Sequence, residues 1–326
     1  MHMSDALVSP AVAIPAGVVS VALMAVAVAR VKRNYSPVTL PMMGVLGAFV
    51  FAAQMLNFAI PGTGSSGHLV GGVLLAAMLG PWAGFLALSA VLVLQCLLFA
   101  DGGLMALGCN ILNMAAVSCL VAYPVLFRPI ASGGGVGRLA TASVVASVVS
   151  LLIGALLVTL ETTLSGVTAL PTLTFLGFML PIHFVIGLIE GVATALVLVV
   201  VRRADPRMLE SGRGEVTHKW RPVVMFVVVV SVALVCAGWI STMASSDPDG
   251  LEWSIERTAG DATPAAEPST LGAVSAELVE NTALLPDYKG AMAGVIGAMI
   301  LLVVAFVLAW IAGRAPWRRR PKSDGR

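Results

Sequence analysis

Residues 173–201 read LTFLGFMLPIHFVIGLIEGVATALVLVVV, a run in which Glu190 is the only residue with a formal charge. An α-helix of roughly 20 apolar residues crosses a bilayer core of about 30 Å, so this stretch is long enough to span a membrane. Seven further runs are comparably apolar: 11–29, 44–60, 81–100, 104–127, 139–160, 223–243 and 290–312. The sequence therefore predicts an all-α integral membrane protein, a polytopic helical bundle.

The composition supports the same class. Of the 326 residues, 58% are hydrophobic and 11% are charged, and the mean hydropathy is +0.97. Soluble domains carry about a quarter of charged residues, so we expect a lipid bilayer to be the solvent for most of this chain. No basic patch with interleaved aromatic residues indicates nucleic acid as a partner. Four cysteines lie inside apolar runs, and we expect them to be buried and unpaired.

A ninth apolar run, 69–79, decides the topology. It is short and carries Gly71 and Gly72. If it crosses the membrane, all but Arg257 and Lys289 of the 19 lysines and arginines fall on one side, and that side is the cytoplasm. We therefore predict about nine crossings in the inner (plasma) membrane, with an extracytoplasmic N-terminus and a cytoplasmic C-terminus. No basic residue precedes the first apolar run, so we expect no cleaved signal peptide.

A polar segment divides the chain into two parts. Residues 1–203 form the first part with seven crossings, residues 204–221 read as a cytoplasmic linker that includes His218, and residues 222–326 form a second part with two crossings. The two last spans are joined by an outer loop that is mostly too polar to bury a core of its own. One short segment of this loop, 248–253, looks ordered: it begins with a Pro-Asp-Gly turn and ends at Trp253. A plain turn with an aromatic anchor is one interpretation of this segment.

The second residue of the chain suggests metal chemistry. His2 can offer three nitrogens together with Met1: the free amine, the amide of residue 2 and the imidazole Nδ1. The resulting chelate rings have five and six members and little strain. Coplanar nitrogens suit nickel(II) or copper(II), with cobalt(II) possible. A fourth nitrogen would complete the plane, and His68 lies on the same predicted outer face.

The loop before His68 has little side-chain bulk, since it reads GTGSSG over residues 62–67. Such a loop allows the N-terminus to approach closely. Imidazoles that bind metals usually need a partner that fixes their tautomer. We expect Asp5, Ser65 or Ser66 to serve in this role.

Several polar residues lie inside apolar runs and should face the interior of the bundle. Gln54 and Asn57 are three residues apart, as are Asn110 and Asn113, so each pair should share a helix face. Two roles remain open for them: hydrogen bonds to the metal-binding loop, or contacts that hold helices together.

His183 and Glu190 are seven residues apart on the run quoted above and therefore share one stripe of that helix. An intramembrane carboxylate is a candidate functional group. The pair could serve as a proton relay in a self-sufficient secondary metal carrier or exporter, which is the alternative function. A structural ion pair or a contact with another subunit is equally compatible with the spacing.

Three motifs identify a family. The opening MHMSDALVSP (1–10), the segment NFAIPGTGSSGHL (57–69) and the segment HFVIGLIEG (183–191) resemble the CbiM/NikM substrate-specific components of energy-coupling-factor transporters. In the second part, DGLEW (249–253) and LPDY (285–288) resemble the small two-span CbiN/NikN partner with its PDGLEW signature. The chain thus resembles a fusion of the two components.

The resemblance implies that Met1, His2 and His68 bind cobalt(II) or nickel(II) as the transported substrate, with no resident cofactor. It also implies a transmembrane coupling protein and cytoplasmic ABC ATPase subunits as partners. The outer loop of the second part is expected to contact the N-terminal region, through Asp249, Gly250, Leu251, Glu252 and Trp253. Ser4 and Ala6 depart from the proline and glycine that are commoner in the opening.

The sequence gives no support for an enzyme. It has no Walker A phosphate loop, no H-E-x-x-H zinc helix and no G-x-S-x-G elbow. We therefore expect a transporter component that has no ATPase of its own, and a membrane enzyme of cobalamin synthesis lacks any nucleophile or cofactor motif.

Overall fold

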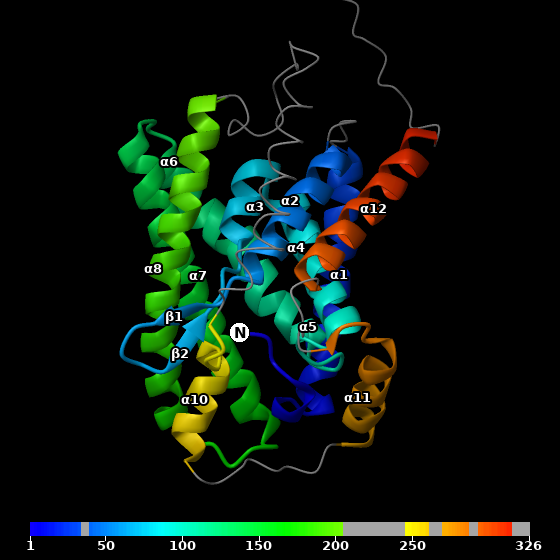
Figure 1. The fold of residues 1–326 in the computed structure, drawn as a ribbon, viewed down its shortest axis with the longest axis vertical. Coiled ribbons are helices and arrows are strands. Elements are labelled where there is room, and N and C mark those ends of the chain that lie inside the picture. The colour runs from blue at the N-terminus through cyan, green and yellow to red at the C-terminus, as the bar shows by residue number, and fades with distance from the viewer. Residues whose placement is uncertain (34–38, 205–244, 261–268, 287–292, 315–326) are drawn as a thin grey trace, which may run out of the picture.

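The structure is a computed structural model, and it describes residues 1–33, 39–204, 245–260, 269–286 and 293–314. The long helices stand side by side in a bundle (Figure 1). The elements of the first part are η1 (Asp5–Leu7), α1 (Pro10–Arg33), α2 (Thr39–Gln54), β1 (Phe58–Ile60), β2 (Ser65–Gly67), α3 (Gly72–Leu79), α4 (Pro81–Phe99), α5 (Leu107–Asn110), η2 (Ile111–Phe127), α6 (Arg128–Ala131), α7 (Val136–Ser165) and α8 (Thr172–Ala204). The second part contributes α10 (Gly250–Ala259), α11 (Thr270–Thr282) and α12 (Ala293–Arg314).

Five helices in the described residues are long and apolar enough to cross a membrane: Pro10–Arg33, Pro81–Phe99, Leu107–Ala131, Val136–Ser165 and Thr172–Ala204. The third of them is continuous through α5, η2 and α6, and the turns of η2 are π-helical. Long side chains on α1, α7 and α8 remain exposed, such as Val18 at 64% and Leu196 at 63%, as a lipid-facing surface requires. The prediction of an all-α, multi-pass membrane protein is confirmed, and the number of nine crossings stays a prediction.

Basic residues gather at one end of the bundle. The Arg202 guanidinium donates to the carbonyl of Gly135 at 3.0 Å, which joins the last turn of α8 to the start of α7. Arg30, near the end of α1, lies 5.6 Å from the centroid of the Trp82 ring at the start of α4. In Figure 1 this end carries α6, while α10 and α11 cover the opposite end.

The apolar run 44–60 does not form one helix, so this prediction is wrong for residues 55–60. Helix α2 begins earlier, at Thr39, and ends at Gln54. Phe58–Ile60 then forms strand β1, which pairs antiparallel with β2, Phe58 opposite Gly67 and Ile60 opposite Ser65. The backbone groups that leave the helix thereby regain hydrogen-bond partners, which a segment at this depth needs.

The short run 69–79 also contains an interrupted helix. Helix α3 has eight residues, which corresponds to about 12 Å of rise, and every residue from Gly72 to Met78 is buried. Gly71 precedes it with φ 75°, a left-handed conformation that glycine tolerates best. Because protein encloses this half-helix, the break can lie within the membrane without exposing backbone groups to lipid.

The outer loop of the second part docks onto the β-hairpin. The Ser66 amide donates to the carbonyl of Pro248 at 2.8 Å, and Ser66 forms a parallel bridge with Asp249. The Trp253 indole Nε1 donates to the carbonyl of Thr63 at 3.0 Å. Gly250 lies against α8, where an added Cβ would meet the Ile186 side chain at 2.9 Å. This side of the hairpin is therefore covered by chain from the second part.

Two helices form in the outer loop because their first turns are capped. The Asp249 side chain accepts from the amides of Leu251 and Glu252, and Glu252 reaches back to the amide of Asp249, which makes a capping box. Ser269 caps α11 in a similar way through the amide of Gly272. The loop was predicted to be mostly too polar to bury a core of its own, and local capping together with contacts to the first part explains why these two segments are helical.

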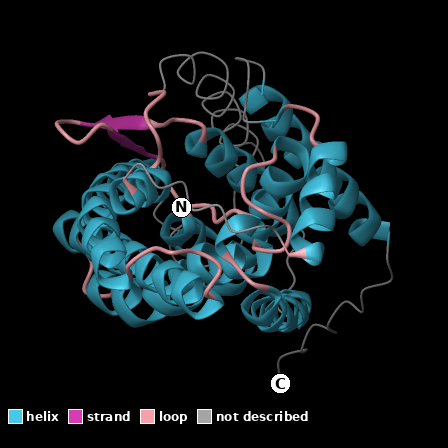
Figure 2. Ribbon diagram, turned by 90° about the horizontal axis from the view of Figure 1, so that it is seen from below, coloured by secondary structure: helices cyan, strands magenta, loops and turns pink. Residues whose placement is uncertain are grey.

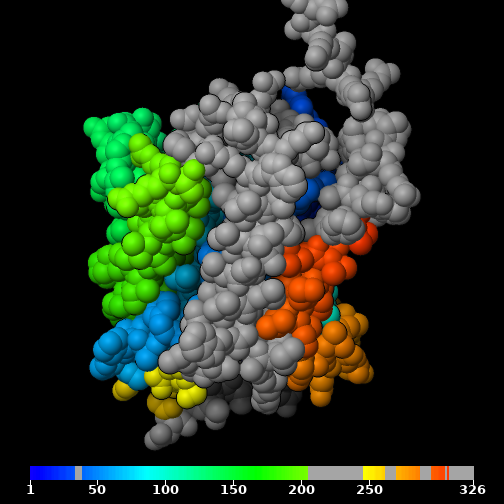
Figure 3. All heavy atoms as spheres, turned by 45° about the horizontal axis from the view of Figure 1, so that its top comes forward, coloured from blue at the N-terminus to red at the C-terminus, as the bar shows by residue number. Residues whose placement is uncertain are grey.

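Figure 2 shows the N-terminus at the centre of the ring of helices, seen from the end that carries α10 and α11. These two helices lie toward the same end in the space-filling view of Figure 3. Cys96, Cys109 and Cys119 are buried and unpaired as expected. The predicted span 223–243, most of the linker 204–221 with His218, and Cys236 lie outside the described residues.

Candidate metal site

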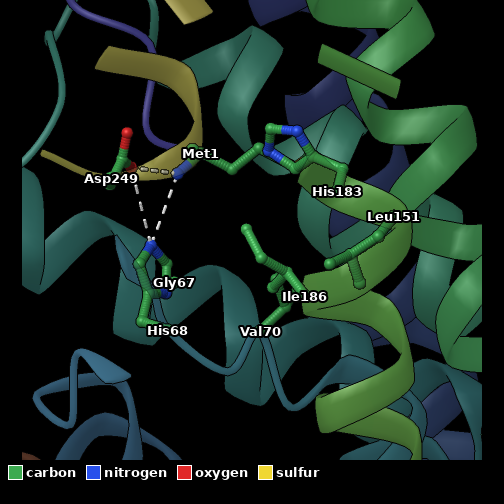
Figure 4. A pocket seen from close by; sticks show the side chains of 9 residues that line it. Met1, Gly67, His68, Val70, Leu151, His183, Ile186 and Asp249 are labelled. Atoms are coloured by element: carbon green, nitrogen blue, oxygen red, sulfur yellow. Dashed lines mark hydrogen bonds and ion pairs between the residues drawn. The ribbon is translucent and has the colours of Figure 1, made fainter. Parts of the chain in front are cut away.

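The amine of Met1 lies in a buried pocket between two side chains. It donates to Asp249 Oδ2 at 2.5 Å, and it is 3.3 Å from His68 Nε2. Met1 is 5% exposed. Figure 4 shows the amine between Asp249 and His68, with His183 and Ile186 of α8 and Leu151 of α7 lining the far wall. Four segments far apart in the sequence therefore meet around the first residue.

Asn110 holds the N-terminal strand in place. Its Oδ1 accepts from the Met3 amide at 2.8 Å, and its Nδ2 donates to the Met3 carbonyl at 3.1 Å. The Gly103 amide donates to the same carbonyl at 2.9 Å. These bonds satisfy the backbone of a buried extended segment, and they fix where the amine can reach.

His68 presents one ring nitrogen to the amine. Its Nδ1 is 3.1 Å from the carbonyl of Leu69, and a carbonyl can only accept, so Nδ1 carries the hydrogen and donates. The lone pair of the neutral ring is then on Nε2, which faces Met1. This is the arrangement in which a backbone carbonyl orients a histidine that binds a metal.

His2 stacks on His68, with ring centroids 5.2 Å apart and an interplanar angle of 16°. Its Nδ1 lies 3.2 Å from Asp101 Oδ1, and its side chain is 6% exposed. Its Nε2 is buried and has no hydrogen-bond partner among the described residues. The nitrogen that the chelate would use therefore contacts a carboxylate in this structure.

Burial and charge keep both rings neutral. Burial and the nearby Met1 amine lower the pKa of His2 from 6.5 to about 3. Burial, the amine and His2 lower the pKa of His68 from 6.5 to about 4. Burial alone would raise the pKa of Asp249, but the amine and His68 outweigh it and hold that pKa below its ordinary value. At neutral pH the site thus offers two neutral imidazoles.

A metal ion at this site would need main-chain nitrogens among its ligands. Across the part of the chain that the structure describes, no group of three His, Cys, Asp or Glu side chains could hold a metal ion. Two adjacent nitrogens around a metal with bonds of about 2.0 Å lie about 2.8 Å apart in a square plane. The amine and His68 Nε2, at 3.3 Å, are close to that spacing.

The residues predicted to support the imidazoles contact other groups. Asp5 Oδ1 accepts from the Ala106 amide at 2.9 Å, and its Oδ2 accepts from the Ser275 hydroxyl of α11. Ser65 and Ser66 direct their hydroxyls to carbonyls, Ser66 to that of Asp247 at 2.8 Å. Ser65 and Ser66 hold the outer loop, and Asp5 ties η1 to Ala106 and to α11. The imidazoles of His68 and His2 instead contact Leu69 and Asp101.

Of the side-chain amides in the apolar runs, Gln54 contacts the segment after His68, and Asn113 lies beside the N-terminal strand. Gln54 Nε2 donates to the Val70 carbonyl at 2.9 Å, and Gln95 donates to Gln54 at 2.6 Å. Asn113 Nδ2 donates to Glu161 at 2.6 Å and lies 3.8 Å from the Met3 sulfur. Asn57 does not share a helix face with Gln54, because α2 ends at Gln54, and its carbonyl accepts from the Ser245 amide at 2.7 Å.

His183 and Glu190 each have a partner of their own. His183 Nδ1 donates to the carbonyl of Met179, one turn earlier on α8, at 2.8 Å. The two oxygens of Glu190 accept from the amides of Val70 at 2.8 Å and Gly71 at 3.1 Å. His183 lines the pocket around Met1, whereas Glu190 binds the loop that follows His68.

Of the outer-loop residues, Asp249 reaches the amine and Gly250 lines the pocket. Leu251 is buried at 2% exposure, Glu252 closes the capping box, and Trp253 packs edge-on against Phe178 at 5.6 Å. Asp101 and Gln95 were not predicted as parts of this network. Asp101 follows a span directly and precedes Gly102 and Gly103, which was a usable signal for a side chain at the mouth of the bundle.

The helices and the buried cluster of nitrogen donors together define a multi-pass membrane protein with an enclosed polar site near one end of its bundle. Residues 2–208 match the family model described as the cobalt uptake substrate-specific transmembrane region, CbiM, and residues 223–314 match the PDGLE domain. The chain therefore belongs to the CbiM family and is a metal-transport component fused to a PDGLE domain.

Relatives with both parts cover the whole chain. It is 30% identical to a putative fused nickel transport protein NikMN of Archaeoglobus fulgidus, over 97% of this chain and 100% of that one. It is 29% identical to the fused nickel transport protein NikMN of Rhodobacter capsulatus, over 100% of both. A crystal structure of a transition metal transporter superimposes with a TM-score of 0.56 at 30% identity, over 63% of this chain and 94% of that chain.

Proposed function

We propose that this protein is the substrate-binding membrane component of an energy-coupling-factor transporter that imports nickel(II) or cobalt(II). The metal binds near the outer face through the Met1 amine, the amide and imidazole of His2, and His68 Nε2. The observation that carries the proposal is the distance of 3.3 Å between the amine and a neutral imidazole inside a buried pocket. The relatives named as nickel transport proteins support the choice of substrate.

Binding by this donor set requires three local changes. The amine loses a proton and its bond to Asp249, the His2 amide loses its proton, and the His2 ring turns so that Nδ1 leaves Asp101 for the metal. The two protons released balance the charge of the divalent ion, and each carboxylate keeps a cation beside it as an electrostatic partner. Four nitrogens in one plane favour nickel(II), and cobalt(II) remains compatible with the same donors.

The role of substrate binding places ATP hydrolysis on other subunits. The proposal includes a transmembrane coupling protein and cytoplasmic ABC ATPases as partners. It also places the protein in the inner membrane, with the site outside and the basic ends of α1, α6 and α8 in the cytoplasm, as the positive-inside rule requires. The first part ends near residue 203, and 204–221 connects it to the two-span part from 222 onward.

Titration calorimetry of the purified full chain in detergent tests the site. We expect His2→Ala and His68→Ala each to weaken nickel(II) and cobalt(II) binding by at least about 100-fold, which corresponds to about 2.7 kcal/mol. His218→Ala, a change in the linker, is the matched control and should bind like the parent. Unchanged binding in both histidine variants would refute the assignment.

The energy source separates this function from a self-sufficient carrier. Proteoliposomes that contain the chain with its coupling protein and ATPases should take up metal when ATP is supplied, and the chain alone under a proton gradient should not. Uptake by the isolated chain with a proton gradient would favour the carrier. His183 and Glu190 contact different partners, the Met179 carbonyl and the Val70 amide, which supports the substrate-binding function over the carrier.

A further inference from the structure

Glu190 is a buried carboxylate in the middle of a membrane helix. It is 1% exposed. It lies 18 residues after the first residue of α8 and 14 before the last, which is about 27 Å and about 21 Å along the axis at about 1.5 Å per residue. A charge at such a depth is costly to keep, so it needs partners and a role.

Its partners are the two amides that precede α3. Glu190 Oε2 accepts from Val70 at 2.8 Å, and Oε1 accepts from Gly71 at 3.1 Å. Amides at the start of a helix have no partner inside the helix, and both residues are buried. One carboxylate therefore satisfies two donors at the break between β2 and α3.

Gln54 holds the opposite side of the same segment. It donates to the Val70 carbonyl at 2.9 Å and accepts from Gln95 at 2.6 Å. Gly71 packs so closely on α2 that an added Cβ would lie 2.7 Å from the Val50 side chain. Residue 70 is thus fixed from both sides, two residues after His68.

The charge of Glu190 also suits the neighbouring cation. The N-terminus of a helix carries a partial positive charge, and the N-terminus of α3 begins four residues after His68. A carboxylate at that end offsets the repulsion that a divalent ion at His68 would otherwise meet.

We propose that Glu190 is a positioning residue for metal capture, which holds the amides of Val70 and Gly71 and thereby sets where His68 Nε2 stands relative to the Met1 amine. This inference rests on the proposed function. It replaces the proton-relay role, because the Glu190 oxygens bind the amides of Val70 and Gly71 and His183 binds the carbonyl of Met179.

The test uses Glu190→Gln in the full chain, with nickel(II) as the probe. The amide keeps the size of the side chain but places a donor against one of the two amides. We expect the Kd for nickel(II) to rise at least about tenfold. Thr194→Val, which removes a buried hydroxyl one turn further along α8, is the control and should bind like the parent.

A double variant tests whether Glu190→Gln weakens nickel(II) binding by displacing His68. In the His68→Ala background, Glu190→Gln should weaken binding no further, because the group that it positions is gone. The nickel(II) absorption spectrum of Glu190→Gln should shift toward that of His68→Ala. A purely structural weakening would leave the spectrum as in the parent, and an equal further loss in the double variant would overturn the inference.

Other outcomes are equally decisive. Normal nickel(II) affinity in Glu190→Gln, with or without loss of uptake, overturns the positioning role. If His68→Ala itself binds normally, the proposed function fails first and the cause is distinguishable. Should Glu190→Gln not remain monodisperse, Glu190→Asp keeps the charge with a shorter reach, and we expect it to weaken binding less than His68→Ala does; binding like the parent would again contradict the proposal.

Discussion

At the scale of single residues, the amine of Met1 and the side chains around it form the proposed metal site. Met1 and Asp249 are 248 positions apart in the sequence, and yet their charged groups are 2.5 Å apart in a buried site. Removing one member of a buried ion pair leaves the other without compensation. The ion pair therefore links the second part of the chain to the residue that we propose as the first metal ligand.

We predict that Asp249→Asn destabilises the metal-free protein. Asparagine still caps α10, so the change isolates the ion pair. Because Asp249 is 17% exposed, the decrease in the free energy of unfolding should be at the low end for a buried ion pair, roughly 1–3 kcal/mol. Thermal melting in detergent with a chelator measures it. Asp247→Asn, an exposed carboxylate close by, should melt like the parent, and equal melting of both variants would contradict the prediction.

The lowered pKa values of the imidazoles predict acid sensitivity. The ordinary pKa of 6.5 falls to about 4 for His68 and about 3 for His2. Below pH 6.5 the unfolded chain binds protons on these rings that the folded chain does not bind, so stability is fully present above pH 6.5 and falls as the pH drops toward 4.

The pH dependence of melting without metal checks this. The melting temperature of the parent should fall more steeply between pH 6.5 and 4.5 than that of His68→Ala. Identical slopes in the two proteins would mean that His68 is already charged in the folded state.

At this scale the sequence predicted the nitrogen donors and part of their surroundings. Met1 and His2 are adjacent, and His68 followed from the topology. The resemblance pointed to Asp249 as a contact of the N-terminal region, whereas the contact of Asp101 with His2 was not predicted, because it depends on how distant segments pack. The network around Glu190 was also missed, since its spacing to His183 suggested a pair within one helix.

At the scale of elements, breaks in regular structure build the site. Apolar runs indicate that a segment is buried, but they do not tell a helix from a helix followed by a strand. Residues 58–60, at the end of the run 44–60, are all apolar. Phe58–Ile60 nevertheless forms a strand, because it pairs with β2. Such pairing cannot be read from one segment alone.

The packing of α10 on α8 can be tested by a substitution at Gly250. A side chain at Gly250 would meet Ile186 at 2.9 Å and His183 at 3.3 Å. We expect Gly250→Val to separate α10 from α8 and to speed hydrogen–deuterium exchange of amides 251–259 by tenfold or more, which is about 1.4 kcal/mol.

Gly177→Val is the matched control, because an added Cβ there would have no atom of the described residues within 4 Å. Exchange in α10 should be the same in this control as in the parent. Slow exchange in Gly250→Val would mean that α10 is held by contacts other than its approach to Ile186.

At the scale of the whole molecule, the charge distribution predicts orientation. Leu164, 75% exposed at the end of α7, should face the outside, and Ser132 after α6 should face the cytoplasm. In a variant with Cys236 replaced by serine, a membrane-impermeant maleimide should label Leu164→Cys in intact cells. It should label Ser132→Cys only after permeabilisation, and the reverse pattern would invert the topology.

We propose that the free amine of Met1 is a metal ligand. One added glycine before Met1 moves the amine by a residue, and the buried position of Met1 leaves little room for it. The direct measurement is the nickel(II) affinity of the purified chain with an intact first residue, compared with the extended chain and with a chain extended by one glycine at its C-terminus. The account predicts that the N-terminal extension weakens binding by at least about 100-fold and that the C-terminal one has no effect. Equal affinity of all three chains would contradict it.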